Sequence, residues 1–108
     1  MKINIIKTTT NNKQIAEIIA HKLVGKKFAP CVQIIPNLIS TYIYEEKIQR
    51  ENEYLILIKT STMNLLKCKE LILKYHNYDV PEIIQLDAEI LNNNYEKWFN
   101  DNCTISKK

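Results

Sequence analysis

The stretch CVQIIPNLISTYIYEEKIQRENEYLILIKT, residues 31–60, decides the fold. Its Val, Ile, Leu, Thr and Tyr content is typical of strands, and it is interrupted only at Pro36-Asn37 and at Glu45-Glu46-Lys47. Because proline cannot donate a ladder hydrogen bond, the first interruption predicts a kink inside a strand. The second predicts a turn, so the stretch forms a hairpin of two strands, 31–44 and 48–60. The run 54–58 is apolar enough to be buried on both faces or central in a sheet.

The hairpin is too long for one domain of this size. Strands of about 14 residues reach about 45 Å at 3.3 Å per residue, whereas a compact chain of this length has a diameter of about 34 Å. One end therefore projects, and it carries Tyr42, Ile43, Tyr44 and Ile48. An exposed edge with such side chains recruits other chains unless an assembly covers it, which predicts a closed homo-oligomer.

A strand and a helix are expected before the hairpin. The β-branched run 3–6 predicts the strand, which ends at the threonines 8–10. The helix has N-cap candidates at Asn11-Asn12 and an expected stop near Gly25. Its apolar face follows the helical spacing of Ile15, Ile18, Ile19 and Leu23.

A second helix, a strand and a short third helix are expected after the hairpin. Ser61 or Thr62 is the expected cap of the second helix, and residues 82–87 alternate as a strand. Trp98 and Phe99 are expected to anchor the last helix by packing. The apolar face of the second helix consists of Leu65, Cys68, Ile72 and Tyr75. The order βαββαβ predicts an α+β, ferredoxin-like fold, with two helices on one face of a four-stranded antiparallel sheet.

Composition narrows the class of protein. The chain, residues 1–108, is predicted to be one domain, and it has a net charge of +3. It shows no basic stripe and no apolar run of membrane-span length, so we expect neither nucleic acid nor membrane as a partner. The three cysteines match no disulfide framework, which favours a reducing, cytoplasmic location; they are Cys31, Cys68 and Cys103. A longer precursor with a removed targeting segment remains an alternative. Gly25 is the only glycine, which excludes a Gly-rich phosphate loop.

Five short segments form a pattern within residues 3–100. They are Cys31-Val-Gln-Ile-Ile-Pro36, Ser40-Thr-Tyr42, Glu51-Asn-Glu53 with Leu57-Ile-Lys59-Thr60, His76-Asn-Tyr78-Asp-Val-Pro81-Glu82, and Tyr95-Glu-Lys-Trp98. The pattern resembles the CutA family, named for divalent-cation tolerance. The resemblance implies a ferredoxin-like fold, a homotrimer whose hairpins extend sheets across subunits, similarity to PII-type signalling proteins and a role in copper binding. Lys7 stands where some relatives carry a cysteine.

His76 and Glu82 are the candidate metal ligands. They flank a loop that contains Pro81, and an imidazole with a carboxylate suits copper, zinc or nickel. Asp79 is a third candidate donor, and the alternative is a loop held by a contact of Glu82 with backbone or lysine. Because one imidazole is a small donor set, we expect no firmly held cofactor. We expect weak binding of Cu(II) or another divalent cation, which weakens below about pH 6.5 as His76 protonates.

Glu51, Glu53, Lys59 and Tyr78 are candidates for a polar pocket between subunits. Such a pocket would bind an anion or a small ligand. The alternative is a structural ion-pair network that fixes the register of the trimer.

No set of residues predicts catalysis. Cys31 and His76 would need a third, orienting group, and the sequence nominates none. We therefore expect a non-enzymatic trimer for divalent metal-ion tolerance or response. The alternative is a structural or signalling trimer, similar to PII proteins, that presents a partner-binding or small-ligand surface, with metal binding incidental.

Overall fold

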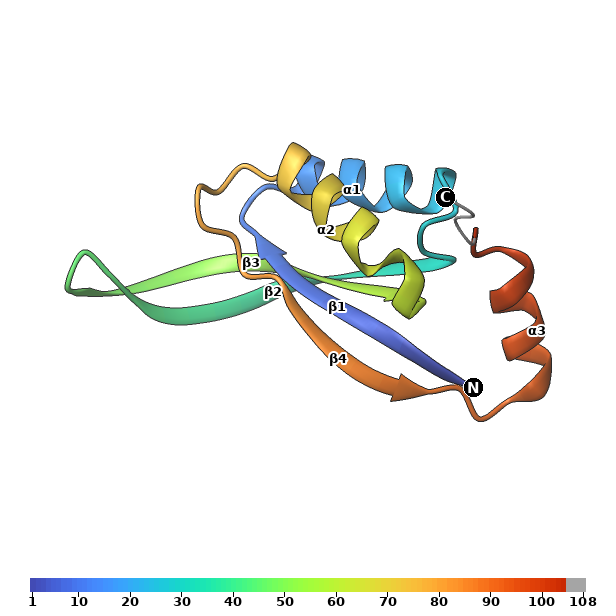
Figure 1. The fold of residues 1–108 in the computed structure, drawn as a ribbon. Helices are drawn as coiled ribbons and strands as arrows, with labels where there is room; N and C mark the ends of the chain where they lie inside the picture. The colour runs from blue at the N-terminus through green and yellow to red at the C-terminus, as the bar shows by residue number, and fades with distance from the viewer. Residues whose placement is uncertain (105–108) are drawn as a thin grey trace.

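The computed structural model describes residues 1–104. Its elements are β1 (Lys2–Thr10), α1 (Lys13–Gly25), β2 (Cys31–Tyr44), β3 (Lys47–Thr60), the 3-10 turn η1 (Thr62–Asn64), α2 (Leu65–Tyr75), β4 (Ile84–Glu89) and α3 (Asn93–Asp101). The strands form one sheet in the order β2-β3-β1-β4, and all neighbours are antiparallel. Helices α1 and α2 cover one face of this sheet (Figure 1). The predicted ferredoxin-like α+β fold is confirmed.

The core lies between this sheet face and the two helices. Alternate residues of the central strands point toward the helices, because side chains along a strand alternate between faces. The buried residues of this layer are Ile6, Ile56 and Ile58 from the sheet, Ala16, Ile19 and Leu23 from α1, and Cys68, Leu71 and Ile72 from α2. All of these are at most 6% exposed, so one chain completes this layer by itself.

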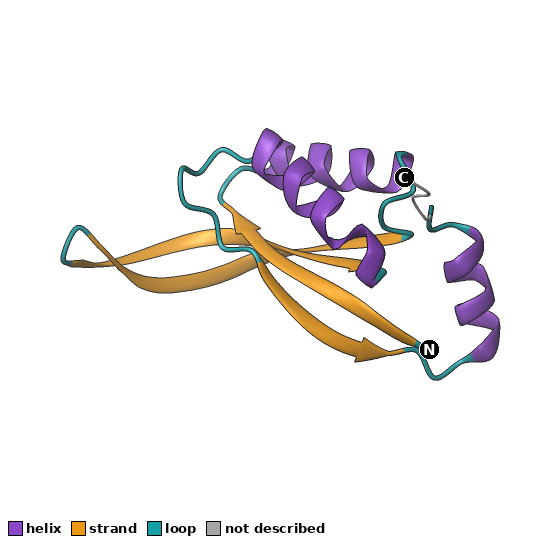
Figure 2. Ribbon diagram, in the orientation of Figure 1, coloured by secondary structure: helices purple, strands orange, loops and turns teal. Residues whose placement is uncertain are grey.

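The opposite face of the sheet, which we call the open face, is also apolar. The strand register places Ile5, Leu55, Leu57, Ile35, Ile84 and Leu86 on it. Ile35, Ile84 and Leu86 are 47%, 45% and 49% exposed. Helices α1 and α2 lie on the other side, and α3 stands at the end of the sheet where β1 begins (Figure 2). Only the end of this face near the start of β1 is buried, where Ile3 is 5% exposed. The chain therefore leaves most of an apolar sheet face uncovered.

The hairpin of β2 and β3 projects from the domain, as the sequence predicted. The molecule measures 46 × 28 × 22 Å, and its radius of gyration is 14.6 Å, against about 13 Å for a compact chain of this length. The predicted kink is a register shift between Ile35 and Leu38, where Asn37 has a φ of 65°. At the tip Glu45 and Glu46 have φ values of 51° and 65°, which glycine or asparagine adopts far more readily than glutamate.

Several local predictions need correction. The second helix has no Ser61 or Thr62 cap, because these residues lead into η1 and Asn64 becomes the N-cap. The last strand begins at Ile84, not at residue 82, because the Thr9 carbonyl on that part of β1 accepts from His76. Trp98 is 42% exposed, so only Phe99, which is fully buried, anchors α3 by burial. The predicted N-cap of the first helix is confirmed, since Asn12 Oδ1 accepts from the Ile15 amide at 3.0 Å.

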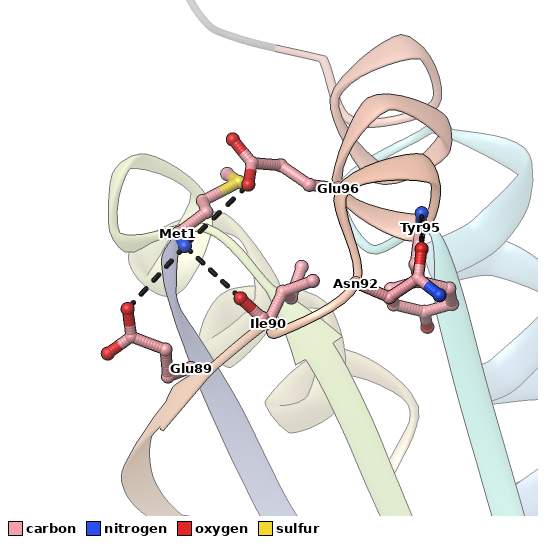
Figure 3. A network of polar contacts seen from close by, with 6 residues as sticks. All are labelled: Met1, Glu89, Ile90, Asn92, Tyr95 and Glu96. Carbon is pink, nitrogen blue, oxygen red and sulfur yellow. Dashed lines mark hydrogen bonds and ion pairs between the residues drawn. The ribbon is translucent and has the colours of Figure 1, made fainter.

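Contacts with Met1 connect β1 to the segment that carries α3 (Figure 3). The Met1 amino nitrogen lies 3.3 Å from the Ile90 carbonyl, 3.6 Å from Glu89 Oε2 and 3.7 Å from Glu96 Oε1. Asn92 caps α3, with its Oδ1 accepting from the Tyr95 amide at 3.0 Å. No helix among residues 1–104 has the length and apolar character needed to cross a membrane.

Candidate functional site

A set of polar side chains joins the base of the hairpin to the loop between α2 and β4. We call it the hairpin–loop network, and its members are Asn11, Ser40, Tyr42, Glu51, Glu53, His76, Asn77 and Tyr78. The two glutamates lie on β3, and the register places Ser40 and Tyr42 on the same face of the hairpin. His76, Asn77 and Tyr78 directly follow the end of α2 at Tyr75.

Glu53 is the buried acceptor of the network. It is only 5% exposed, and its two carboxylate oxygens accept hydrogen bonds from Ser40 Oγ at 2.6 Å and from the Tyr78 hydroxyl at 2.7 Å. Among the described residues, no lysine or arginine forms an ion pair with it. Hydroxyl donors thus stabilise this carboxylate in place of a cation.

Glu51 connects the hairpin to the end of β1. It accepts from the Tyr42 hydroxyl and from Asn11 Nδ2, each at 2.7 Å. Asn11 Oδ1 in turn accepts from Asn77 Nδ2 at 2.9 Å, and Asn77 Oδ1 accepts from Thr10 Oγ1 at 2.6 Å. This chain of hydrogen bonds holds the loop after α2 against the hairpin.

Both ring nitrogens of His76 have partners. Nε2 donates to the Thr9 carbonyl at 2.9 Å, and Nδ1 accepts from the Tyr78 amide at 3.1 Å. These partners require the neutral form with its proton on Nε2. Burial lowers the pKa of His76 from its ordinary value, although the bond to the Thr9 carbonyl and the charge of Glu53 act in the opposite direction.

Two tyrosine hydroxyls in the network hold their protons more tightly than usual. Burial raises the pKa of Tyr78, and its hydrogen bond to Glu53 raises it further. The hydrogen bond to Glu51 raises the pKa of Tyr42. Both hydroxyls are therefore fixed as hydrogen-bond donors to the carboxylates.

The metal-ligand candidates do not form a metal centre within one chain. Glu82 Oε2 lies 3.1 Å from Lys7 Nζ, so this carboxylate has a cationic partner, while Asp79 is exposed. Among residues 1–104 there is no group of three or more His, Cys, Asp and Glu side chains that could hold a metal ion. A cation bound through His76 would also have to displace one of its hydrogen bonds. This donor set does not fit a resident metal.

The candidates for a polar pocket separate into two places within the chain. Glu51, Glu53 and Tyr78 belong to the hairpin–loop network. Lys59 lies about 20 Å further along β3 from Glu53. Its Nζ is 3.4 Å from the Tyr95 hydroxyl and 5.5 Å from the centre of that ring.

Sequence reasoning missed the roles of Asn11, Ser40 and Asn77 in the network. Asn11 was expected only as a helix cap, and Asn77 is an exposed residue between two more conspicuous ones. The available signal was their position inside or beside the segments that resemble the CutA family, since Ser40 and Asn77 both belong to those segments.

These features define a small ferredoxin-like α+β protein with a projecting hairpin and a network of hydroxyls, amides and carboxylates at its base. A family model described as CutA1 divalent ion tolerance protein matches residues 4–102. The divalent-cation tolerance protein CutA of Thermus thermophilus is 35% identical over 98 residues, which are 91% of this chain and 95% of that protein. The chain belongs to the CutA1 divalent ion tolerance family.

Solved structures agree with this assignment. The Thermus thermophilus divalent cation tolerance protein has a TM-score of 0.88 at 34% identity, with 96% of this chain and 100% of that chain covered. CutA1 from Oryza sativa has a TM-score of 0.91 at 33% identity, with coverages of 97% and 95%. The chloroplastic protein CutA 1 of Oryza sativa subsp. japonica is 34% identical over 102 residues, and the match spans 94% of this chain but only 58% of that protein.

Proposed function

We propose that the protein acts in divalent metal-ion tolerance or response as a non-enzymatic homotrimer that binds copper or other divalent cations weakly. Membership of the CutA1 family supports the tolerance role. The uncovered, apolar open face of the sheet is the observation that carries the homotrimer. The alternative is a structural or signalling trimer, similar to PII proteins, in which metal binding is incidental.

The exposed surface supports an assembly. The chain exposes 7337 Å², whereas a compact monomer of 12.7 kDa exposes about 6,200 Å². Large apolar side chains are exposed at the hairpin tip, where Ile43 and Ile48 are 75% and 78% exposed, and on the open face, where Leu86 is 49% exposed. Contacts with further copies of the chain would bury both regions, because closed homo-oligomers are the common way to cover such faces.

The site geometry supports weak metal binding. A divalent cation that uses His76 and Glu82 must replace one of the two hydrogen bonds of His76, which donates to the Thr9 carbonyl and accepts from the Tyr78 amide. It must also replace the ion pair of Glu82 with Lys7. These replacements cost free energy, and the set contains one nitrogen donor, so we propose micromolar or weaker Cu(II) binding.

The three thiols support a reducing, cytoplasmic location, which we propose. Cys31, Cys68 and Cys103 are all free, as expected for proteins in a reducing compartment. Two relatives are named chloroplastic, so location differs among family members.

Two measurements test this function. Light scattering of the purified protein at micromolar concentration should give three times the mass of the chain, and a monomer would contradict the trimer. Calorimetric titration with Cu(II) should give micromolar or weaker binding that His76→Ala removes and His21→Ala leaves unchanged. No binding at millimolar Cu(II) would favour the alternative, and nanomolar binding that survives His76→Ala would contradict the proposed ligands.

A further inference from the structure

A basic groove with aromatic walls lies on the helical layer, away from the open face. It runs between the C-terminal end of α1 and the length of α2, and its volume is about 300 Å³. Lys22 lines it from α1, Lys26 from the C-cap position directly after α1, and Lys67 and Lys74 from α2. These lysines are separated by up to about fifty residues in the sequence, but the packing of α1 against α2 places them around one groove.

The groove concentrates the charge of the chain. Its four lysines and one acid, Glu70, give it a net charge of +3, which equals the formal net charge of the whole chain. The rest of the chain is therefore formally neutral. None of the four lysines forms an ion pair among residues 1–104, and Glu70 is the only acidic side chain among the described residues that line the groove.

Aromatic rings hold the ammonium groups at two ends of the groove. Lys22 Nζ and Lys74 Nζ lie 5.2 Å and 5.4 Å from the centre of the Tyr75 ring. At the other end Lys67 Nζ lies 5.3 Å from the centre of the Phe28 ring. Cation–π contacts of this length restrict where the lysine side chains point. The positive charges are thus positioned at both ends before a ligand arrives.

We propose that this groove binds an oligophosphate, either a free inorganic chain or the triphosphate of a nucleotide. Lysine ammonium groups bind phosphate as point charges, and a chain of several phosphates can contact both ends of the groove at once. The volume lies at the low end for ligand sites, which suits a small ligand. Binding would not require a Gly-rich loop, because side chains and not backbone amides supply the charge.

The test uses calorimetric titration of the full chain with sodium tripolyphosphate at about 10 mM salt, where the Debye length is about 30 Å. We expect binding that weakens steeply at 150 mM salt. The double variants Lys22→Gln/Lys74→Gln and Lys26→Gln/Lys67→Gln should each weaken it by about five- to thirtyfold. Loss in only one double variant would contradict a ligand that spans the groove.

A matched control separates this site from a solvated lysine surface. Lys13 and Lys69 are exposed lysines of the same two helices outside the groove, so Lys13→Gln/Lys69→Gln removes the same charge. This control should bind within about twofold of the parent. Equal weakening in control and groove variants, or no binding of tripolyphosphate, would overturn the proposal.

The source of the phosphate is distinguished by titration with ATP. Equal binding of ATP and tripolyphosphate assigns recognition to the phosphate chain, and tighter binding of ATP with the same dependence on the groove lysines assigns the ligand to a nucleotide. Binding of adenosine as tight as that of ATP would contradict recognition of phosphate. Circular dichroism of each variant confirms that both helices remain folded.

Discussion

The two faces of the sheet are made by the same strands, yet only one of them is complete in a single chain. On the helix-covered face Ile56 and Ile58 are fully buried. On the open face their neighbours Leu55 and Leu57 are only partly buried, and Leu86 is 49% exposed. Since both faces are apolar, the difference lies in what covers them. Intramolecular packing stabilises one face, and the proposed homotrimer would cover the other.

The largest effect is expected from truncating one residue on each face. Ile58→Ala leaves a cavity under the helices and should lower the free energy of unfolding by about 2 to 5 kcal/mol. Leu57→Ala should act mainly on subunit association, so its effect on unfolding should depend on protein concentration. Denaturant unfolding at two protein concentrations measures both. If both variants lost the same free energy of unfolding at both protein concentrations, the proposed difference between the two faces would be contradicted.

A smaller effect is expected from the buried carboxylate at the base of the hairpin. In Glu53→Gln the amide nitrogen cannot accept a hydrogen bond, so either Ser40 or Tyr78 loses its acceptor. The free energy of unfolding should fall by about 1 to 3 kcal/mol. Glu51→Gln is the matched control, because Glu51 is less buried and should cost about 1 kcal/mol or less. Equal losses in the two variants would show that burial of Glu53 does not matter.

Substitutions at the hairpin tip should raise the stability of the chain, unlike those in the sheet and at Glu53. Glu45 and Glu46 occupy left-handed positions, and Glu45→Asn/Glu46→Gly should stabilise the chain by about 1 to 2 kcal/mol. Glycine removes the Cβ that clashes with the backbone, and the short polar side chain of asparagine tolerates this conformation through local hydrogen bonds. Thermal unfolding measures the gain. Glu45→Gln/Glu46→Ala removes the same two charges and keeps a Cβ on residues that do not favour left-handed backbone, so stabilisation by this variant would point to charge repulsion instead.

The smallest effect is expected from pH. Because burial lowers the pKa of folded His76, the unfolded chain binds a proton more readily. The contribution of His76 to stability is complete above its unfolded pKa of about 6.5 and is lost as pH falls toward the lower folded pKa. The difference in unfolding free energy between parent and His76→Gln should therefore shrink between pH 7.5 and 5. His21→Gln is the control, and a difference that grows on acidification would contradict the assignment.

Much of the fold could be predicted because its signals are local. The run 31–60, the helical spacing of Ile15 to Leu23 and the cap at Asn12 depend on neighbouring residues. The cap of α2 could not be predicted in this way. The side chain of Asn64 donates to the carbonyls of Phe28 and Thr104, so distant parts of the chain determine how this helix begins.

The candidate site was predictable only in part, because some of its contacts join distant parts of the chain. His76, Glu53 and Tyr78 were identified from segments that resemble a family, and the structure joins Glu53 to Tyr78 directly. The separation of Lys59 from the two glutamates follows from their spacing along one strand, which the sequence pattern already predicted. By contrast, the pairing of Glu82 with Lys7 depends on β4 lying beside β1.

The masses of two leucine variants test most directly whether copies of this chain cover the open face. Leu86 on the open face is 49% exposed, and Leu73 on α2 is 48% exposed, so their replacement by glutamate makes the same change at equal exposure. By light scattering at micromolar concentration, Leu73→Glu should keep the trimer mass and Leu86→Glu should shift it toward the monomer. A trimer that persists in Leu86→Glu, or that is lost equally in both variants, would contradict assembly through this face.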